Sequence, residues 1–112
     1  MTNIIHITSK EHFQQELAHP GVSLVDFYAD RCGPCRMLFP SLEQLAKENE
    51  EKGIKILKIN IDEVPALAEE FDVTTIPTIF FAKGGEMKEG FVGVNPSSFY
   101  QEKIDAYLTT KS

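Results

Sequence analysis

Residues 22–36 read VSLVDFYADRCGPCR, and this stretch contains the two features that decide the fold. A run of β-branched and aromatic residues, typical of a strand buried on both faces, leads into a Cys-Gly-Pro-Cys segment. Cys32 and Cys35 are the only cysteines among 112 residues, and Arg31 and Arg36 bracket them. Two thiols at this spacing can form a redox couple, supply half of a metal site, or pack as inert side chains.

The composition is that of one globular domain. A chain of 112 residues can build one domain with a real core but not two ordinary ones, so we predict a single domain over residues 1–112. A formal net charge of -6, with no basic block, argues against nucleic-acid binding. The apolar runs are far shorter than the roughly 20 residues that cross a bilayer, so no membrane contact is expected.

The N-terminal stretch MTNIIHITSK has neither a basic leader nor a long apolar run, which predicts a cytoplasmic protein. In a reducing compartment, paired cysteines are more often catalytic or metal-binding than structural. A metal site needs about four ligands, and there is no second cysteine pair. The histidines His6, His12 and His19 all lie near the N-terminus in no ligand-like spacing, so we expect no metal.

The hydrophobic pattern predicts five strands and four helices. We expect strands at residues 4–7, 22–29, 54–61, 76–82 and 87–93. Helices are expected after a cap at Thr8 or Ser9, over 34–50 and 65–71, and from Pro96 onward. Strands separated by helices imply parallel pairing, and a hairpin at residues 83–86 adds an antiparallel edge. The predicted fold is α/β, with three layers and a central mixed five-stranded sheet between helices.

The Cys-Gly-Pro-Cys segment lies where the second predicted helix begins. Free N–H groups and the helix dipole at this end favour an anion, and the reactive anion of cysteine is the thiolate. Arg31 and Arg36 add positive charge nearby. We expect Cys32 to be the more exposed thiol and Cys35 to point toward the protein. That asymmetry suits attack on a disulfide by Cys32 and resolution of the mixed disulfide by Cys35.

The chain resembles the thioredoxin family over essentially its whole length. The resemblance rests on residues in that family's order and spacing: Val25 to Ala29, Cys32-Gly33-Pro34-Cys35, Pro40, Lys58, Asp62, Ile76-Pro77-Thr78 and Gly93. It implies a thioredoxin fold and a protein-disulfide reductase. It also implies that the chain binds no cofactor, and that a thioredoxin reductase using NADPH recycles it. We expect a monomer that acts on disulfide-containing proteins.

The resemblance also assigns roles to individual residues. Cys32 would be the nucleophile and Cys35 the resolving thiol, with Asp26 as a buried acid beneath the active site and Lys58 as a lysine near it. The residues that would bind the substrate chain are Gly33, Pro34, Ile76, Pro77 and Gly93, and the peptide bond before Pro77 would be cis. Asp26 and Lys58 are charges in apolar strands, so they could instead form a buried ion pair that only fixes the fold.

The sequence departs from the family beside the cysteines. Tyr28 and Arg31 stand where thioredoxins usually carry tryptophan, and this chain has no Trp. We expect both residues to modulate the active site, affecting substrate preference more than reaction type.

Other functions remain open at this point. An oxidase or isomerase is possible within the same chemistry, although Gly-Pro between the cysteines is typical of the reducing members. A binding module that uses only its surface is a second class, but such a role would not need the two cysteines.

Overall fold

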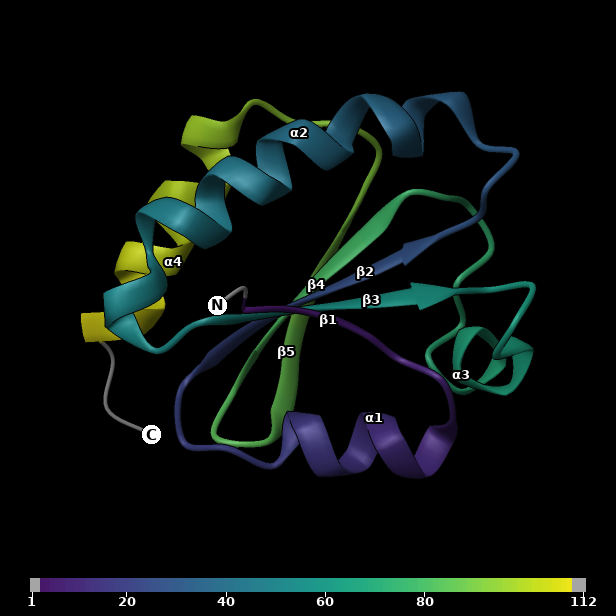
Figure 1. Cartoon of the computed structure of the whole chain (residues 1–112), viewed down its shortest axis with the longest axis horizontal. Helices are drawn as coiled ribbons and strands as arrows, with labels where there is room; N and C mark the ends of the chain where they lie inside the picture. The colour runs from purple at the N-terminus through teal and green to yellow at the C-terminus, as the bar shows by residue number, and fades with distance from the viewer. Residues whose placement is uncertain (1–2, 110–112) are drawn as a thin grey trace.

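The computed structural model describes residues 3–109. The strands are β1 (Ile4–His6), β2 (Val22–Tyr28), β3 (Lys55–Asn60), β4 (Thr78–Lys83) and β5 (Glu86–Val92). The helices are α1 (Lys10–Leu17), α2 (Gly33–Glu48), α3 (Pro65–Glu70) and α4 (Ser97–Thr109), with a 3-10 turn, η1 (Glu50–Lys52), after α2. Seen nearly edge-on in Figure 1, the sheet has α2 and α4 over one face and α1 and α3 over the other. The three-layer α/β prediction is confirmed.

The strands form one mixed sheet in the order β1-β3-β2-β4-β5. β1 and β2 both run parallel to β3, as predicted for strands joined through helices. β4, however, runs antiparallel to β2, so the prediction of parallel pairing is wrong for this strand. A parallel connection needs a crossover that returns along the sheet. α3 has only 6 residues and lies beyond the end of β3, so β4 starts from the same end (Figure 1).

Most predicted boundaries shift by one or two residues, and two of these shifts have a clear local cause. β4 begins at Thr78 rather than Ile76, since Pro77 has no N–H to give to a sheet ladder. α4 begins at Ser97 rather than Pro96, whose carbonyl instead accepts the Phe99 N–H at 2.9 Å. At α1, the Ser9 side chain accepts the His12 N–H, so Ser9 is the cap.

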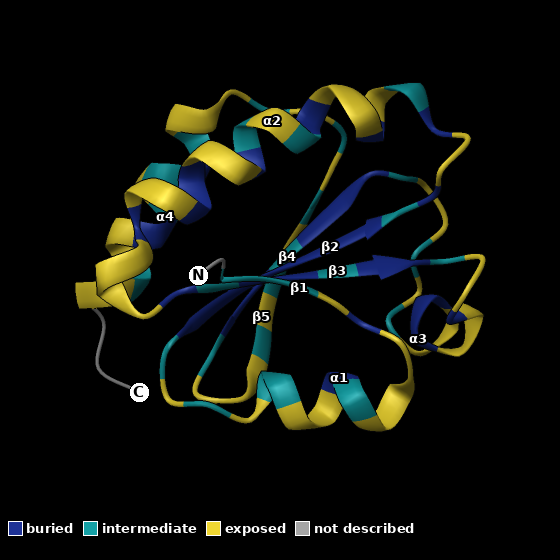
Figure 2. Cartoon of the chain, viewed as in Figure 1, coloured by how far each residue is buried: buried dark blue, intermediate teal, exposed yellow. Residues whose placement is uncertain are grey.

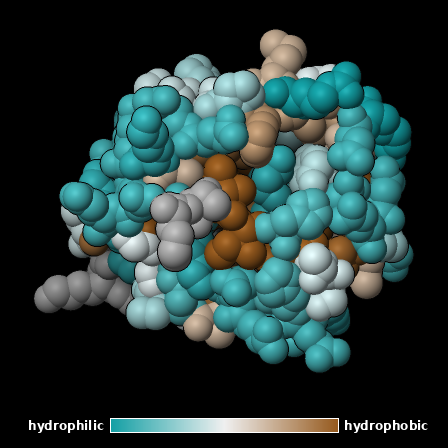
Figure 3. Space-filling view, in the orientation of Figure 1, coloured by the Kyte–Doolittle hydropathy of each residue, from teal (hydrophilic) through white to brown (hydrophobic). Residues whose placement is uncertain are grey.

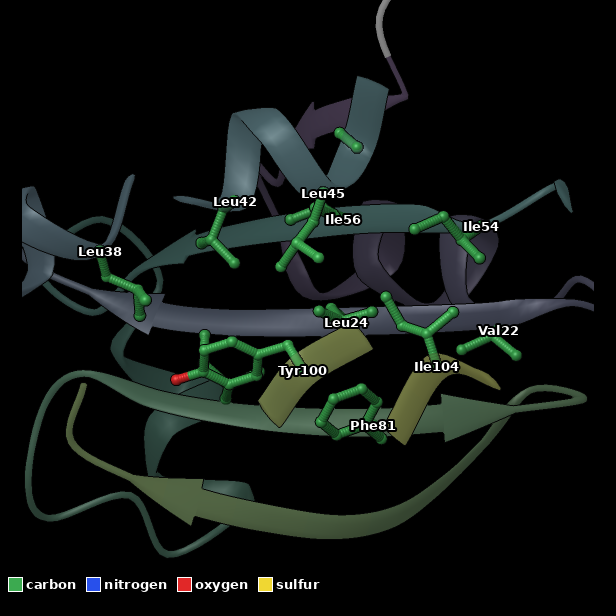
Figure 4. Close-up of a cluster of buried hydrophobic side chains, with 12 residues drawn as sticks. Val22, Leu24, Leu38, Leu42, Leu45, Ile54, Ile56, Phe81, Tyr100 and Ile104 are labelled. Atoms are coloured by element: carbon green, nitrogen blue, oxygen red, sulfur yellow. The ribbon is translucent and has the colours of Figure 1, made fainter. Parts of the chain in front are cut away.

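Each face of the sheet has its own hydrophobic core. On one face, side chains of α2 and α4 pack on the strands, as Figure 4 shows for Leu38, Leu42, Leu45, Tyr100 and Ile104. On the other face lie Phe13, Val25, Phe27, Leu57, Ile59 and Leu67. Figure 2 shows burial concentrated in the strands, with the exposed residues of the helices turned outward. The molecular surface in Figure 3 is mostly hydrophilic, with apolar atoms near the centre of this view.

Gly90 on β5 leaves space for an aromatic ring. Its register partner on β4 is Phe80, and a Cβ added to Gly90 would lie 2.8 Å from Phe80 Cε2. The Phe80 ring is also held by Phe27 and Phe71, at centroid distances of 5.7 and 6.0 Å. The ring therefore cannot move aside without disturbing its aromatic neighbours.

We predict that Gly90→Ala lowers the free energy of unfolding by about 1–3 kcal/mol, the usual cost of overpacking. Urea denaturation followed by circular dichroism measures the change. Gly33→Ala is the matched control, because a Cβ there meets nothing within 4 Å. Equal stabilities for Gly90→Ala and the unmodified protein would show that the ring relaxes freely.

Candidate active site

The two cysteines lie at the start of α2. Cys32 is the N-cap residue and Pro34 follows in the first turn, where the missing N–H of proline leaves no helix bond unmade. The cysteines form a disulfide with a Cα–Cα distance of 5.2 Å. The Cys35 N–H donates to Cys32 Sγ at 3.2 Å. A sulfur at this position thus has a backbone donor and the positive end of the helix dipole beside it.

Both cysteines are buried in the disulfide form, at 8% exposure for Cys32 and 6% for Cys35. Cys32 is the more exposed of the two cysteines, as expected, but the difference in exposure is small. A partner must therefore approach closely before it can reach Cys32.

The two arginines are engaged in contacts of their own. Arg31 Nη2 lies 3.3 Å from Asp62 Oδ1, and both side chains are exposed. Arg36 Nη1 donates to the Asp30 carbonyl at 2.7 Å. Asp62 offsets the Arg31 charge, so the helix N-terminus is the larger source of positive potential at Cys32.

We predict that in the reduced protein the alkylation rate of Cys32 rises at a lower pH than that of a free cysteine. Iodoacetamide kinetics across pH, measured in Cys35→Ser so that one thiol reacts, test this. Arg31→Trp should raise the midpoint only slightly, since Asp62 already screens the charge. A midpoint at or above that of an unperturbed thiol would contradict the prediction.

The predicted substrate-binding residues fall into two segments on either side of the disulfide. Ile76 packs against the cluster of Ala29, Cys32 and Cys35, and the Ile76–Pro77 bond is cis. The Gly93 N–H donates to the Pro77 carbonyl at 2.8 Å, which ties the end of β5 to this loop. On the helix side, Pro34 is exposed and Gly33 partly so.

Asp26 and Lys58 are register partners on β2 and β3. Asp26 is buried, and among the described residues its Oδ1 has no hydrogen-bond partner. Burial raises the pKa of Asp26 to about 7, while the Lys58 charge acts in the opposite direction. Burial also lowers the pKa of Lys58, which Asp26, Glu43 and Asp30 partly offset. A carboxyl with such a pKa can exchange a proton near neutral pH.

A pocket of about 440 Å³ opens beside the resolving cysteine. Its lining residues are Tyr28, Ala29, Asp30, Cys35, Arg36, Phe39 and Lys58. The Lys58 Nζ lies 4.2 Å from the Tyr28 ring centroid and 3.7 Å from that of Phe39. The ammonium group therefore lies against two aromatic faces, and Tyr28, Cys35 and Lys58 line the same pocket.

A metal-binding cluster and a membrane-spanning helix are both absent from residues 3–109. No group of three or more His, Cys, Asp or Glu side chains is arranged to hold a metal ion there. Over the same range, no helix combines the length and apolar character that a membrane span requires.

Sequence reasoning missed Phe39 and His6. Phe39 follows the apolar periodicity of α2, so nothing marked it as a partner of a lysine. His6 is distant from the cysteines in the sequence, but the pairing of β1 with β3 places it opposite Lys58 and beside Tyr28. The placement of β1 next to β3 was the information that the sequence lacked.

Comparisons with known proteins agree with this geometry. The thioredoxin family profile matches residues 4–106. Thioredoxin from Chlorobaculum thiosulfatiphilum is 41% identical over 88% of this chain and 91% of its own length. The chloroplastic M-type thioredoxin of Spinacia oleracea is 42% identical over 77% of this chain, and the match covers only 47% of that protein. The solved structure of a mutant thioredoxin from Halobacterium salinarum superposes with a TM-score of 0.88, at 31% identity and coverage of 97% of this chain and 94% of that one.

A cysteine pair at the start of α2, a cis proline loop packed against it and a match over residues 4–106 all agree. The chain belongs to the thioredoxin family.

Proposed function

We propose that this chain is a thiol–disulfide oxidoreductase that reduces protein disulfides. The observation that carries the proposal is the Cys32–Cys35 disulfide at the N-terminus of α2, with the Cys35 N–H on Cys32 Sγ. In the reduced form, the Cys32 thiolate attacks one sulfur of the substrate disulfide and forms a mixed disulfide, releasing a substrate thiolate. Cys35 then attacks Cys32 Sγ, which forms the intramolecular disulfide and releases the second substrate thiol. Two electrons pass to the substrate.

Asp26 and Lys58 assist the second step in this proposal. Asp26 accepts the Cys35 proton, directly or through a water, and Lys58 adjusts the pH at which Asp26 can do so. Support comes from the burial of Asp26, its pKa of about 7 and the presence of Lys58 and Cys35 in one pocket.

Substrate binding is assigned to the surface around the disulfide. The residues are Gly33, Pro34, Ile76, Pro77 and Gly93, with the backbone of Ile76 pairing with the substrate chain in a strand-like manner. Tyr28 and Arg31 modulate the site: Tyr28 forms part of the pocket wall, and Arg31 places a cation near Cys32.

The remaining expectations complete the proposal. The chain acts as a single domain over residues 1–112, as a monomer, without a bound cofactor and without nucleic-acid or membrane partners. A thioredoxin reductase using NADPH restores the dithiol. We assign it to the cytoplasm, although its relatives include chloroplastic and bacterial thioredoxins. The net charge of -6 supports the absence of nucleic-acid partners.

Reduction of insulin disulfides by dithiothreitol tests the activity. The unmodified protein should accelerate insulin precipitation, and Cys35→Ser should not turn over. An unaccelerated reaction with the unmodified protein would favour a binding module that uses only its surface.

A further inference from the structure

A short chain of hydrogen bonds connects the edge strand β1 to the pocket beside Cys35. Tyr28 Oη lies 3.4 Å from His6 Nδ1, and His6 Nε2 lies 2.9 Å from Glu63 Oε1. The rings of His6 and Tyr28 meet edge-on, with centroids 6.4 Å apart. His6 is half-exposed, yet both of its ring nitrogens are engaged. Because each ring nitrogen has its own partner, Tyr28 and Glu63 together specify the orientation of the His6 ring.

The directions of these hydrogen bonds follow from the chemistry of the groups. The Glu63 carboxylate can only accept, so His6 Nε2–H donates to it. In the neutral imidazole Nδ1 is then an acceptor, and the Tyr28 hydroxyl donates to it. The Asn60 side-chain oxygen accepts the Asp62 N–H at 2.9 Å. The amide hydrogens of Asn60 remain available to Tyr28. Burial raises the pKa of Tyr28, and a hydrogen bond from Asn60 acts in the opposite direction. The Tyr28 hydroxyl is therefore fixed from two sides.

The fixed Tyr28 ring decides where the Lys58 ammonium group can lie. Lys58 faces three carboxylates: Asp26 inside the sheet, Glu43 on α2 and Asp30 after β2. The rings of Tyr28 and Phe39, at 4.2 and 3.7 Å, flank the ammonium. If the Tyr28 ring moved, Lys58 would be free to turn toward the exposed Asp30 or Glu43, where water solvates it better.

The sheet register places the end of this chain beside Asp26. His6, Lys58 and Asp26 are register partners across β1, β3 and β2. Asp26 Oδ1 has no hydrogen-bond partner in the described residues, so the field of nearby charges matters more to it than to a solvated carboxylate. Three further carboxylates act on the neighbours of Asp26. Glu43 and Asp30 act on Lys58, and Asp30 and Glu63 act on Tyr28.

We propose that His6 is a positioning residue: anchored by Glu63, it holds the Tyr28 ring against Lys58 and so sets how strongly that ammonium group acts on Asp26. The proposal rests on the proposed function, because it concerns the group that would take the proton of Cys35. His6 touches neither substrate nor sulfur in this role. Its effect passes through Tyr28 and Lys58.

The test is the pH titration of the Asp26 carboxyl, followed by NMR of its side-chain carbon in the oxidised protein. Lys58→Met should move the Asp26 midpoint to higher pH, because an opposing charge is removed. His6→Leu and Tyr28→Phe should move it in the same direction by less. His6→Gln should restore most of the original midpoint, since its amide can donate to Glu63 and accept from Tyr28. His12→Leu is the matched control, because His12 pairs with Glu16 on α1 instead.

A double-mutant cycle separates positioning from a direct effect of His6 on Asp26. Added to Lys58→Met, His6→Leu should produce no further shift. In the reduced protein with an intact lysine, it should slow resolution of a mixed disulfide about twofold at pH 7, as fewer Asp26 carboxyls are ionised. An unshifted midpoint in His6→Leu, or an equal shift with and without Lys58, overturns the proposal. The NMR titration needs no turnover, so a failure of the proposed reductase activity is detected separately by insulin reduction.

Discussion

Asp26→Asn is expected to raise the free energy of unfolding of the oxidised protein at pH 8 by about 2–4 kcal/mol. In the unfolded chain the carboxyl has its ordinary pKa of 3.8, and in the folded protein burial raises the pKa to about 7. Between these values the folded state binds a proton that the unfolded state has lost, so stability falls as pH rises. Above pH 7 the folded protein carries the full cost of a buried charge, which asparagine removes.

The pH dependence identifies the cause of this gain. At pH 4 the Asp26 carboxyl is protonated in the folded protein and about half protonated in the unfolded chain, so most of the advantage of Asp26→Asn should disappear. Guanidinium unfolding at pH 4 and pH 8 gives the comparison. Asp105→Asn, at an exposed carboxylate 3.8 Å from Lys52, is the matched control and should show little change at either pH. A gain for Asp26→Asn that is equal at both pH values would assign it to packing instead of charge.

The same substitution should slow the resolving step, on the order of tenfold, since a positioned base is lost. The loss should be clearest below neutral pH, where little Cys35 ionises without help. Single-turnover reduction of a model disulfide across pH measures it. If Asp26→Asn or Asp26→Ala lowers stability and leaves turnover unchanged, Asp26 is structural and its proposed role is wrong.

Cys32→Ser is expected to reduce insulin reduction to the background rate of dithiothreitol alone. A hydroxyl does not attack a disulfide at neutral pH, and Cys35 is the more enclosed thiol, at 6% exposure in the disulfide form. The fold should survive, because serine is a good N-cap and can accept the Cys35 N–H in place of sulfur. Thermal unfolding checks this point. Turnover by Cys32→Ser close to that of the unmodified protein would reassign the nucleophile.

Local patterns were enough to predict most of the fold. The buried run at residues 22–28, the helix signals at Ser9 and Pro34, and the turn before β5 each act within a few residues of chain. The direction of β4 could not be predicted in this way. It depends on which end of the sheet the chain has reached when the 6-residue helix α3 ends, and this is a property of the assembled fold.

Some residues of the candidate site could be predicted from the sequence and others could not. Cys32 and Cys35 are marked by residue type and spacing, Pro77 by the resemblance to thioredoxins, and Asp26 and Lys58 by charge in apolar strands. His6, Glu63 and Phe39 carry no such mark, because their contacts with Tyr28 and Lys58 join segments far apart in the sequence. Strand register places His6 beside Lys58, whereas Phe39 reaches Lys58 from α2 and Glu63 reaches His6 from the loop between β3 and α3.

In the proposed mechanism Cys32 attacks the substrate and Cys35 resolves the mixed disulfide. The most direct measurement is to mix reduced Cys35→Ser with an oxidised substrate protein, digest without reductant and locate the mixed disulfide by mass spectrometry. The mechanism predicts a stable adduct at Cys32, and no adduct under the same conditions with the unmodified protein, in which Cys35 releases the substrate. The absence of an adduct at Cys32, or an equally stable one in the unmodified protein, would contradict it.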